Sequence, residues 1–85
     1  MVIKMNENDI RKIIYKIFEQ NDISLQNINE NISLISSGIV DSMTFVNILL
    51  SIEDELNIEI DFENIDINSI VTINSLCDAV SKITN

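Results

Sequence analysis

The residue best placed to do chemistry is Ser42, in the segment Gly38-Ile39-Val40-Asp41-Ser42-Met43. A stretch of turn-forming residues ends there and a long helical pattern begins, so the sequence predicts Ser42 at a helix N-terminus. A hydroxyl at that position faces solvent, and the helix dipole favours an attached anion. The segment therefore predicts an attachment point for a phosphate-bearing group.

The sequence offers Ser42 no general base. The chain contains no His, and its lysines lie on other segments with no motif that pairs them with the serine. A nucleophilic serine needs a base within hydrogen-bond distance, and the Gly-x-Ser-x-Gly pattern of many hydrolases is absent. We therefore expect the chain to be no enzyme, and we predict no catalytic residue.

Asp41 or Ser42 could instead simply cap the helix, as such residues commonly do. The two interpretations are compatible, because Asp41 can cap while the Ser42 hydroxyl points outward. Calcium binding is the other alternative for an acidic chain. Residues 61–66, however, lack the glycine and the spacing to a terminal glutamate that a calcium loop needs. We therefore predict no metal site.

Size and charge restrict the class of protein. A chain of 85 residues is expected to form one domain, residues 1–85. Its net charge of −9 disfavours nucleic acid and anionic membranes and favours basic partners. No segment is long enough to span a membrane, and residues 1–6 lack the apolar run of a signal peptide. We expect a cytoplasmic monomer that neither binds nucleic acid nor inserts into membranes.

Apolar residues that recur at helical spacing predict three long helices. The first follows a cap at Asn6 or Asn8 and ends near residue 20. The second runs from residue 41 or 42 to about residue 56 or 57, and the third follows Thr72 as its N-cap. The residues expected to face the core are Ile10, Ile13, Ile14, Ile17 and Phe18 in the first helix, Phe45, Ile48, Leu49, Ile52 and Leu56 in the second, and Ile73, Leu76, Cys77, Val80 and Ile83 in the third.

Two connections join these helices. The long one, residues 21–40, needs apolar anchors inside a compact domain, and we expect them to be Ile23, Leu25, Ile28, Ile32, Leu34 and Ile35. The second, residues 61–71, is predicted to form a short helical turn around Phe62, Ile65 and Ile67. A strand at residues 58–62 is the alternative, because polar and apolar residues alternate there. We rank it lower since no second strand is evident to pair with it.

The second helix has an additional apolar face. Met43, Val46 and Leu50 lie opposite its core-facing residues, and we call these three residues the narrow stripe. The long connection could cover the narrow stripe, or the stripe could be an exposed contact surface beside Ser42. We expect partial exposure. Glu53 and Asp54 follow; acids in a run usually form only a solvated face, but beside an apolar stripe they indicate docking of a basic partner.

Three segments together resemble the acyl carrier protein superfamily. Residues 34–43 (Leu34-Ile35-Ser36-Ser37-Gly38-Ile39-Val40-Asp41-Ser42-Met43) resemble its modification loop, residues 46–60 its recognition helix, and residues 72–76 the start of its last helix. The resemblance covers nearly the whole chain. It implies an all-α fold, a four-helix bundle with a short third helix and a long first loop.

The resemblance also implies a function. A phosphopantetheinyl transferase would move 4′-phosphopantetheine from coenzyme A onto Ser42, with Asp41 helping to position the metal-bound coenzyme A. The thiol of the arm would then carry an acyl or aminoacyl group as a thioester, loaded by an adenylating enzyme and passed on by acyl-transfer enzymes. The positions that match the partner contacts of such carriers are Met43, Val46, Leu50, Glu53 and Asp54.

The motif also bears on the subtype. Gly-x-x-Asp-Ser-Met resembles D-alanyl carrier proteins and related stand-alone aminoacyl or peptidyl carriers. Carriers of fatty-acid synthesis usually have one residue between Gly and Asp and a Leu after the serine, so a fatty-acid role is the alternative subtype. An unmodified acidic helical adaptor that binds a basic protein is the alternative of another class.

Overall fold

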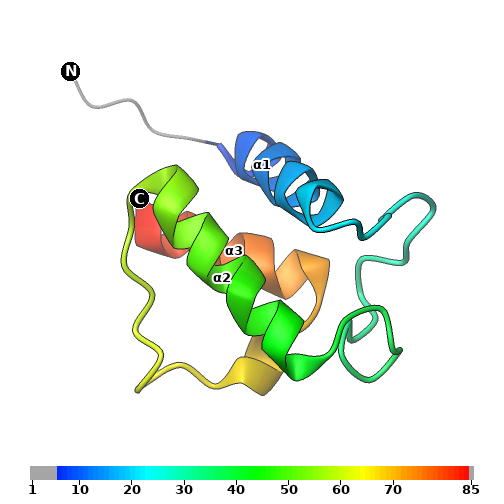
Figure 1. The fold of residues 1–85 in the computed structure, drawn as a ribbon. Coiled ribbons are helices and arrows are strands. Elements are labelled where there is room, and N and C mark those ends of the chain that lie inside the picture. Colours follow the sequence, from blue (N-terminus) through cyan, green and yellow to red (C-terminus); the bar gives the residue numbers. More distant parts are fainter. Residues whose placement is uncertain (1–5, 85) are drawn as a thin grey trace.

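The computed structural model describes residues 6–84, which form three α-helices and one 3₁₀ turn (Figure 1). The elements are α1 (Glu7–Gln20), α2 (Ser42–Leu56), the 3₁₀ turn η1 (Ile67–Ser69) and α3 (Ile73–Thr84). No strand occurs in the described part of the chain, so the all-α prediction is confirmed and residues 58–62 are not a strand. The prediction about a signal peptide falls mainly on residues 1–5, outside the described residues.

The expected short third helix is represented only by η1. Asp66 caps this turn by accepting a hydrogen bond from the Asn68 N–H at 3.0 Å. With three residues, Ile67–Ser69, it is too short for the backbone bonding of an α-helix, which closes over four residues. The described residues therefore form three α-helices rather than the four-helix bundle that the resemblance implied.

Side-chain caps fix where α1 and α3 begin. The Asn6 side chain accepts a hydrogen bond from the Asp9 N–H at 2.9 Å, so Asn6 rather than Asn8 is the cap. At α3, Thr72 Oγ1 accepts from the Ser75 N–H at 3.0 Å, and Ser75 Oγ accepts from the Thr72 N–H at 3.2 Å. This reciprocal pair is a capping box, which satisfies two backbone donors at once, and it confirms Thr72 as the N-cap.

The core lies where α1 packs against both α2 and α3 (Figure 1). The predicted core residues that are fully buried are Ile10, Ile14, Ile17, Phe18, Phe45, Ile48, Leu49, Ile52, Ile73, Leu76, Cys77 and Val80. Ile13 and Leu56 are only half-buried, and the prediction for Ile83 is wrong because its side chain is 40% exposed. Ile83 stands in the last turn of α3 and lines an open hollow together with Glu59 and Ile65.

The long connection is held down by apolar side chains and by backbone hydrogen bonds. The predicted anchors that are buried or half-buried are Ile23, Leu25, Ile28, Leu34 and Ile35, whereas Ile32 is more exposed, at 36%. The Leu34 N–H donates to the Val71 carbonyl at 2.8 Å, and the Asn74 N–H donates to the Glu30 carbonyl at 3.1 Å. Both bonds join the connection to the start of α3.

A polar cluster, which we call the Glu30 cluster, joins the same connection to two helices. Glu30 Oε2 accepts from the Tyr15 hydroxyl at 2.7 Å and pairs with Arg11 Nη1 at 2.8 Å. Arg11 Nη1 also donates to Asn74 Oδ1 of α3 at 3.1 Å. The hydrogen bond from Tyr15 and that from Arg11 lower the pKa of Glu30, while burial and the Glu30 hydrogen bond raise the pKa of Tyr15 to about 12. At neutral pH Glu30 is therefore ionised and Tyr15 keeps its proton, as the hydrogen bond from the Tyr15 hydroxyl to the Glu30 carboxylate requires.

Candidate functional site

The segment that precedes α2 is fixed at both of its ends. Val40 is buried, and its N–H donates to the Leu34 carbonyl at 3.1 Å. Between Leu34 and Val40, Gly38 has a φ of 82°, a left-handed conformation that glycine adopts without a steric penalty. No atom stands within 4 Å of where its Cβ would be, so the glycine is required by the turn and not by crowding. The turn delivers the chain to the start of α2.

Asp41 is the N-cap of α2. It has extended backbone angles, φ −89° and ψ 171°, and its Oδ1 accepts a hydrogen bond from the Thr44 N–H at 2.7 Å. Hydrogen bonds from the backbone and the side chain of Thr44 lower the pKa of Asp41. The carboxylate is exposed and remains ionised at neutral pH, as a helix N-terminus favours.

Ser42 is the first residue of α2, and its side chain is exposed. Because Asp41 does the capping, the hydroxyl is left without a hydrogen-bond partner among residues 6–84. The first backbone N–H groups of a helix have no partner within the helix, and they favour a bound phosphate. An exposed hydroxyl beside such donors fits a covalently attached phosphodiester.

The narrow stripe is accessible. Met43 is 76% exposed and Leu50 is 48% exposed, while Val46 is half-buried. The opposite face of α2, which includes Phe45 and Ile52, is fully buried. The expected partial exposure is thus confirmed, and the long connection does not cover the stripe.

The two predicted docking acids differ in their surroundings. Asp54 is exposed, with no hydrogen bond or ion pair found for it in the described part of the chain. Glu53 is half-buried, and its Oε2 accepts a hydrogen bond from the Ile60 N–H at 2.6 Å. This difference cannot be read from the spacing of the acids, because Ile60 approaches Glu53 only after the chain has turned back beyond α2.

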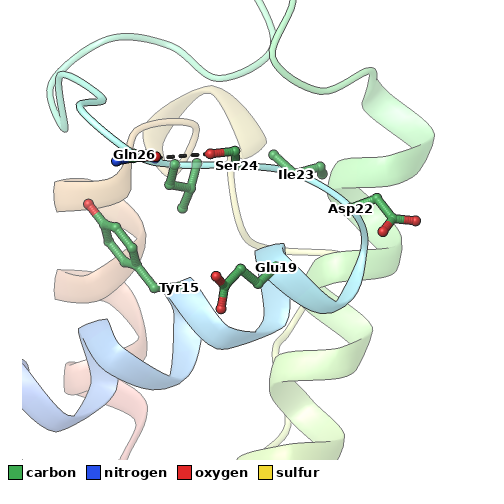
Figure 2. A pocket seen from close by; sticks show the side chains of 7 residues that line it. Tyr15, Glu19, Asp22, Ile23, Ser24 and Gln26 are labelled. Atoms are coloured by element: carbon green, nitrogen blue, oxygen red, sulfur yellow. Dashed lines mark hydrogen bonds between the residues drawn. The ribbon is translucent and has the colours of Figure 1, made fainter.

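A second hollow, of about 510 Å³, lies between α1 and the residues that follow it (Figure 2). Its lining includes Tyr15, Glu19, Asp22 and Leu25 and no residue of α2. Figure 2 shows Tyr15 and Asp22 on opposite sides, so these polar groups do not converge on one point. No group of His, Cys, Asp or Glu suited to a metal ion occurs within residues 6–84. The hollow is therefore lined neither by Ser42 nor by the narrow stripe.

Cys77 is fully buried in α3. Burial raises the pKa of its thiol to about 11, so the thiolate that would react is scarce near neutral pH. The expectation that Cys77 faces the core is confirmed.

These features define a small helical domain that presents one exposed serine at the start of a helix with an accessible apolar stripe. A model of the family described as the phosphopantetheine attachment site matches residues 9–80, and the chain belongs to this family, within the acyl carrier protein superfamily. The group that such a domain bears is 4′-phosphopantetheine, held covalently. Comparison with the curated proteins found no match. None of the helices within residues 6–84 is long and apolar enough to cross a membrane.

Proposed function

We propose that the chain is a discrete carrier protein that holds acyl or aminoacyl groups as thioesters on a 4′-phosphopantetheine arm attached to Ser42. The observation that supports this most is the exposed Ser42 hydroxyl, which has no partner within residues 6–84 because its neighbour Asp41 caps the helix. Membership of the phosphopantetheine attachment family supplies the chemistry of the arm.

Ser42 and Asp41 are the side chains that would take part in the attachment. Ser42 would present its oxygen to the phosphorus that bears the phosphopantetheine group in coenzyme A and give its proton to a base of the transferase, since the chain has no His. The new O–P bond would replace the P–O bond to adenosine 3′,5′-bisphosphate, which would leave with the electron pair of that bond. Asp41, kept ionised by Thr44, would help to hold the divalent cation that accompanies coenzyme A. The N-terminus of α2 would stabilise the resulting phosphodiester.

After attachment the protein would act by tethering and not by catalysis. The arm's terminal thiol carries the thioester, and the tether raises its effective concentration at enzymes that bind the carrier. The narrow stripe and Asp54 are the surface that such enzymes would contact. The partners on this proposal are a phosphopantetheinyl transferase, an adenylating enzyme that loads the thiol, and acyl-transfer enzymes that unload it, all in the cytoplasm and each binding a monomeric carrier.

The subtype that the motif favours is a D-alanyl or other aminoacyl carrier. Two residues separate Gly38 from Asp41, and Met43 follows the serine, as in the carriers of that kind that the segment resembles. To test the subtype, the modified protein is incubated with adenylating enzymes, ATP and single amino acids. Loading by an amino acid supports the proposal, while loading only by a fatty acyl-activating enzyme would support fatty-acid synthesis instead.

Intact-mass measurement tests the attachment itself. The protein is incubated with coenzyme A, Mg²⁺ and a broad-specificity phosphopantetheinyl transferase, and we expect one phosphopantetheine adduct per chain. Ser42→Ala abolishes the adduct. Ser36→Ala, which removes another exposed serine hydroxyl from the preceding loop, serves as the matched control and retains it. An unmodified adaptor would give no adduct with any of the three proteins.

A further inference from the structure

The two sulfur-bearing residues within residues 6–84, Met43 and Cys77, lie in opposite surroundings. Cys77 is fully buried in α3, and burial raises the pKa of its thiol to about 11, so a dissolved oxidant meets neither an accessible sulfur nor a thiolate there. Met43 is 76% exposed, and a thioether has no proton to lose before it reacts. In the described part of the chain, the sulfur that an oxidant reaches first is therefore that of Met43.

The position of Met43 in α2 explains its exposure. It is the second residue of the helix, which begins at Ser42, so no preceding helical turn covers it. Val46 and Leu50, three and seven residues on, share its face and leave it open, because the first is half-buried and the second exposed. Helical side chains lean toward the N-terminus of their helix, and the Met43 thioether thus leans toward the end of α2 that carries Ser42.

A peroxide is the class of oxidant that suits such a thioether. A lone pair of the sulfur attacks one oxygen of hydrogen peroxide, and an S–O bond forms as the O–O bond breaks. The departing oxygen keeps the electron pair of the broken bond, takes the proton of the transferred oxygen and leaves as water. The sulfur is oxidised by one electron pair and the peroxide is reduced by the same pair. A methionine sulfoxide reductase reverses the change, giving methionine and water while a dithiol becomes a disulfide.

Oxidation would change the polarity of the narrow stripe at its most exposed residue. The stripe consists of apolar side chains, whereas methionine sulfoxide carries a polar oxygen. An enzyme that covers the stripe would have to remove water from that oxygen, which is unfavourable unless the enzyme offers a hydrogen-bond donor. The buried face of α2 does not include Met43, so the fold should tolerate the sulfoxide.

We propose that Met43 is a site of reversible oxidation by peroxides, and that its sulfoxide weakens the binding of partner enzymes to the narrow stripe. This modification changes no charge and needs no enzyme to install it. It would make docking sensitive to peroxide at the residue next to Ser42. The part about docking rests on the proposed carrier function; the part about oxidation does not.

Peptide mapping by mass spectrometry tests the oxidation on the full chain without phosphopantetheine, because the thiol of the arm would itself consume peroxide. Folded and urea-unfolded protein are treated with hydrogen peroxide. Met43 should gain one oxygen atom at rates that agree within about threefold between the two, since the fold leaves it exposed. Cys77 should react at least roughly tenfold more slowly in the folded protein. Stronger protection of Met43, or oxidation of Cys77 before Met43 in the folded protein, would overturn the proposal.

The effect on docking is measured as kcat/KM for the attachment of phosphopantetheine by the transferase, after the peroxide has been removed. The oxidised wild type should lose roughly five- to fiftyfold, as expected when a polar atom is buried without a partner. Methionine sulfoxide reductases of both stereospecificities should restore the value. Thermal denaturation should show that the oxidised protein is folded at the assay temperature; a protein unfolded there would overturn the proposal.

Met43→Leu is the matched control, because leucine keeps the position apolar and has no sulfur to oxidise. Each protein is compared with its own untreated sample, since the substitution itself alters the stripe. Peroxide should leave kcat/KM of Met43→Leu within about twofold of its untreated value.

Two results of this comparison would overturn the proposal. An equal loss in treated Met43→Leu would assign the effect to another residue, and an oxidised wild type with unchanged kcat/KM would show that the sulfoxide does not disturb docking. A wild-type protein that is never modified, even untreated, would contradict the carrier function, while peptide mapping would still decide whether Met43 is the site of oxidation.

Discussion

Asp41 and Ser42 are adjacent in the chain but have different roles. The Asp41 side chain accepts a hydrogen bond from the Thr44 N–H and begins the helix, which leaves the Ser42 hydroxyl exposed and without a hydrogen-bond partner in the described chain. This division was predictable from the sequence, because Asp is a strong N-cap and a helix has only one N-cap residue. The residues that form the site are neighbours in the sequence, so their arrangement can be predicted from a short motif.

Variants at Asp41 separate its structural task from its proposed task in modification. Asp41→Asn keeps an oxygen that can cap α2 and should lower Tm less than Asp41→Ala does, because Asn and Asp are similar as caps. Both variants remove the charge and should slow the attachment of phosphopantetheine. Thermal denaturation measures the first effect and time-resolved intact mass the second. If Asp41→Asn is modified at the wild-type rate, the carboxylate does not assist in attachment.

Cys77 should be nearly inert to alkylation. With a pKa of about 11, its thiolate fraction at pH 8 is roughly two-hundredfold below that of an ordinary cysteine with a pKa of about 8.5. Iodoacetamide should therefore add slowly to the unmodified protein and quickly, once per chain, to the protein that bears the phosphopantetheine thiol. Mass spectrometry distinguishes the two forms. Rapid labelling of Cys77 in the unmodified protein would show that the core opens around α3.

At the scale of the element, α2 shows what periodicity can and cannot predict. Its two apolar faces follow from spacing alone, so the buried Phe45 and the exposed Met43 were both expected. The hydrogen bond from the Ile60 N–H to the Glu53 carboxylate was not expected. The chain reverses between these two residues at Asn57, whose left-handed conformation no periodic pattern specifies. In the sequence Glu53 is one of a run of acids, and only the folded turn distinguishes it from Asp54.

The two faces of α2 should respond differently to substitution. Met43→Asp lies at a position that is 76% exposed and should change the free energy of unfolding by about 0.5 kcal/mol or less, as surface substitutions usually do. Phe45→Ala empties a fully buried position and should cost about 3–5 kcal/mol. Urea denaturation measures both.

Recognition by partner enzymes should depend on Met43 even though the stability of the fold does not. Met43→Asp places a charge in the narrow stripe and should lower transfer by partner enzymes while the protein stays folded, measured as kcat/KM for modification or loading. Should Met43→Asp unfold the protein, the stripe is part of the core and the docking assignment fails. A stable variant that is modified and loaded normally would exclude Met43 alone from the docking surface.

At the scale of the whole molecule, the long connection depends on contacts between segments far apart in the sequence. Several of its apolar anchors were expected from their residue types, but Ile32 has the same type and is exposed. The Glu30 cluster helps to hold this region in place, and it joins residues of α1, the connection and α3. No spacing rule relates Arg11, Glu30 and Asn74, so the sequence could not show that they meet.

The Glu30 cluster predicts how the stability of the molecule depends on pH. Because folding lowers the pKa of Glu30, its contribution is present above the unfolded pKa of about 4.3 and is lost as the pH falls through the lower folded value. Folding raises the pKa of Tyr15 to about 12, so its contribution is complete below the unfolded pKa of about 10 and is lost as the pH rises through about 12.

Glu30→Gln should therefore destabilise the protein by about 1–3 kcal/mol at pH 7, the usual cost of weakening hydrogen bonds to a charged group. The difference from the wild type should shrink at pH 3, where the wild-type carboxyl begins to protonate. Glu63→Gln, at an exposed position with no hydrogen bond or ion pair found in the described chain, is the control and should cost little at either pH. Urea denaturation at the two pH values makes the comparison. A Glu30→Gln deficit that is equal at pH 7 and pH 3 would mean that the charge of Glu30 does not hold the long connection in place.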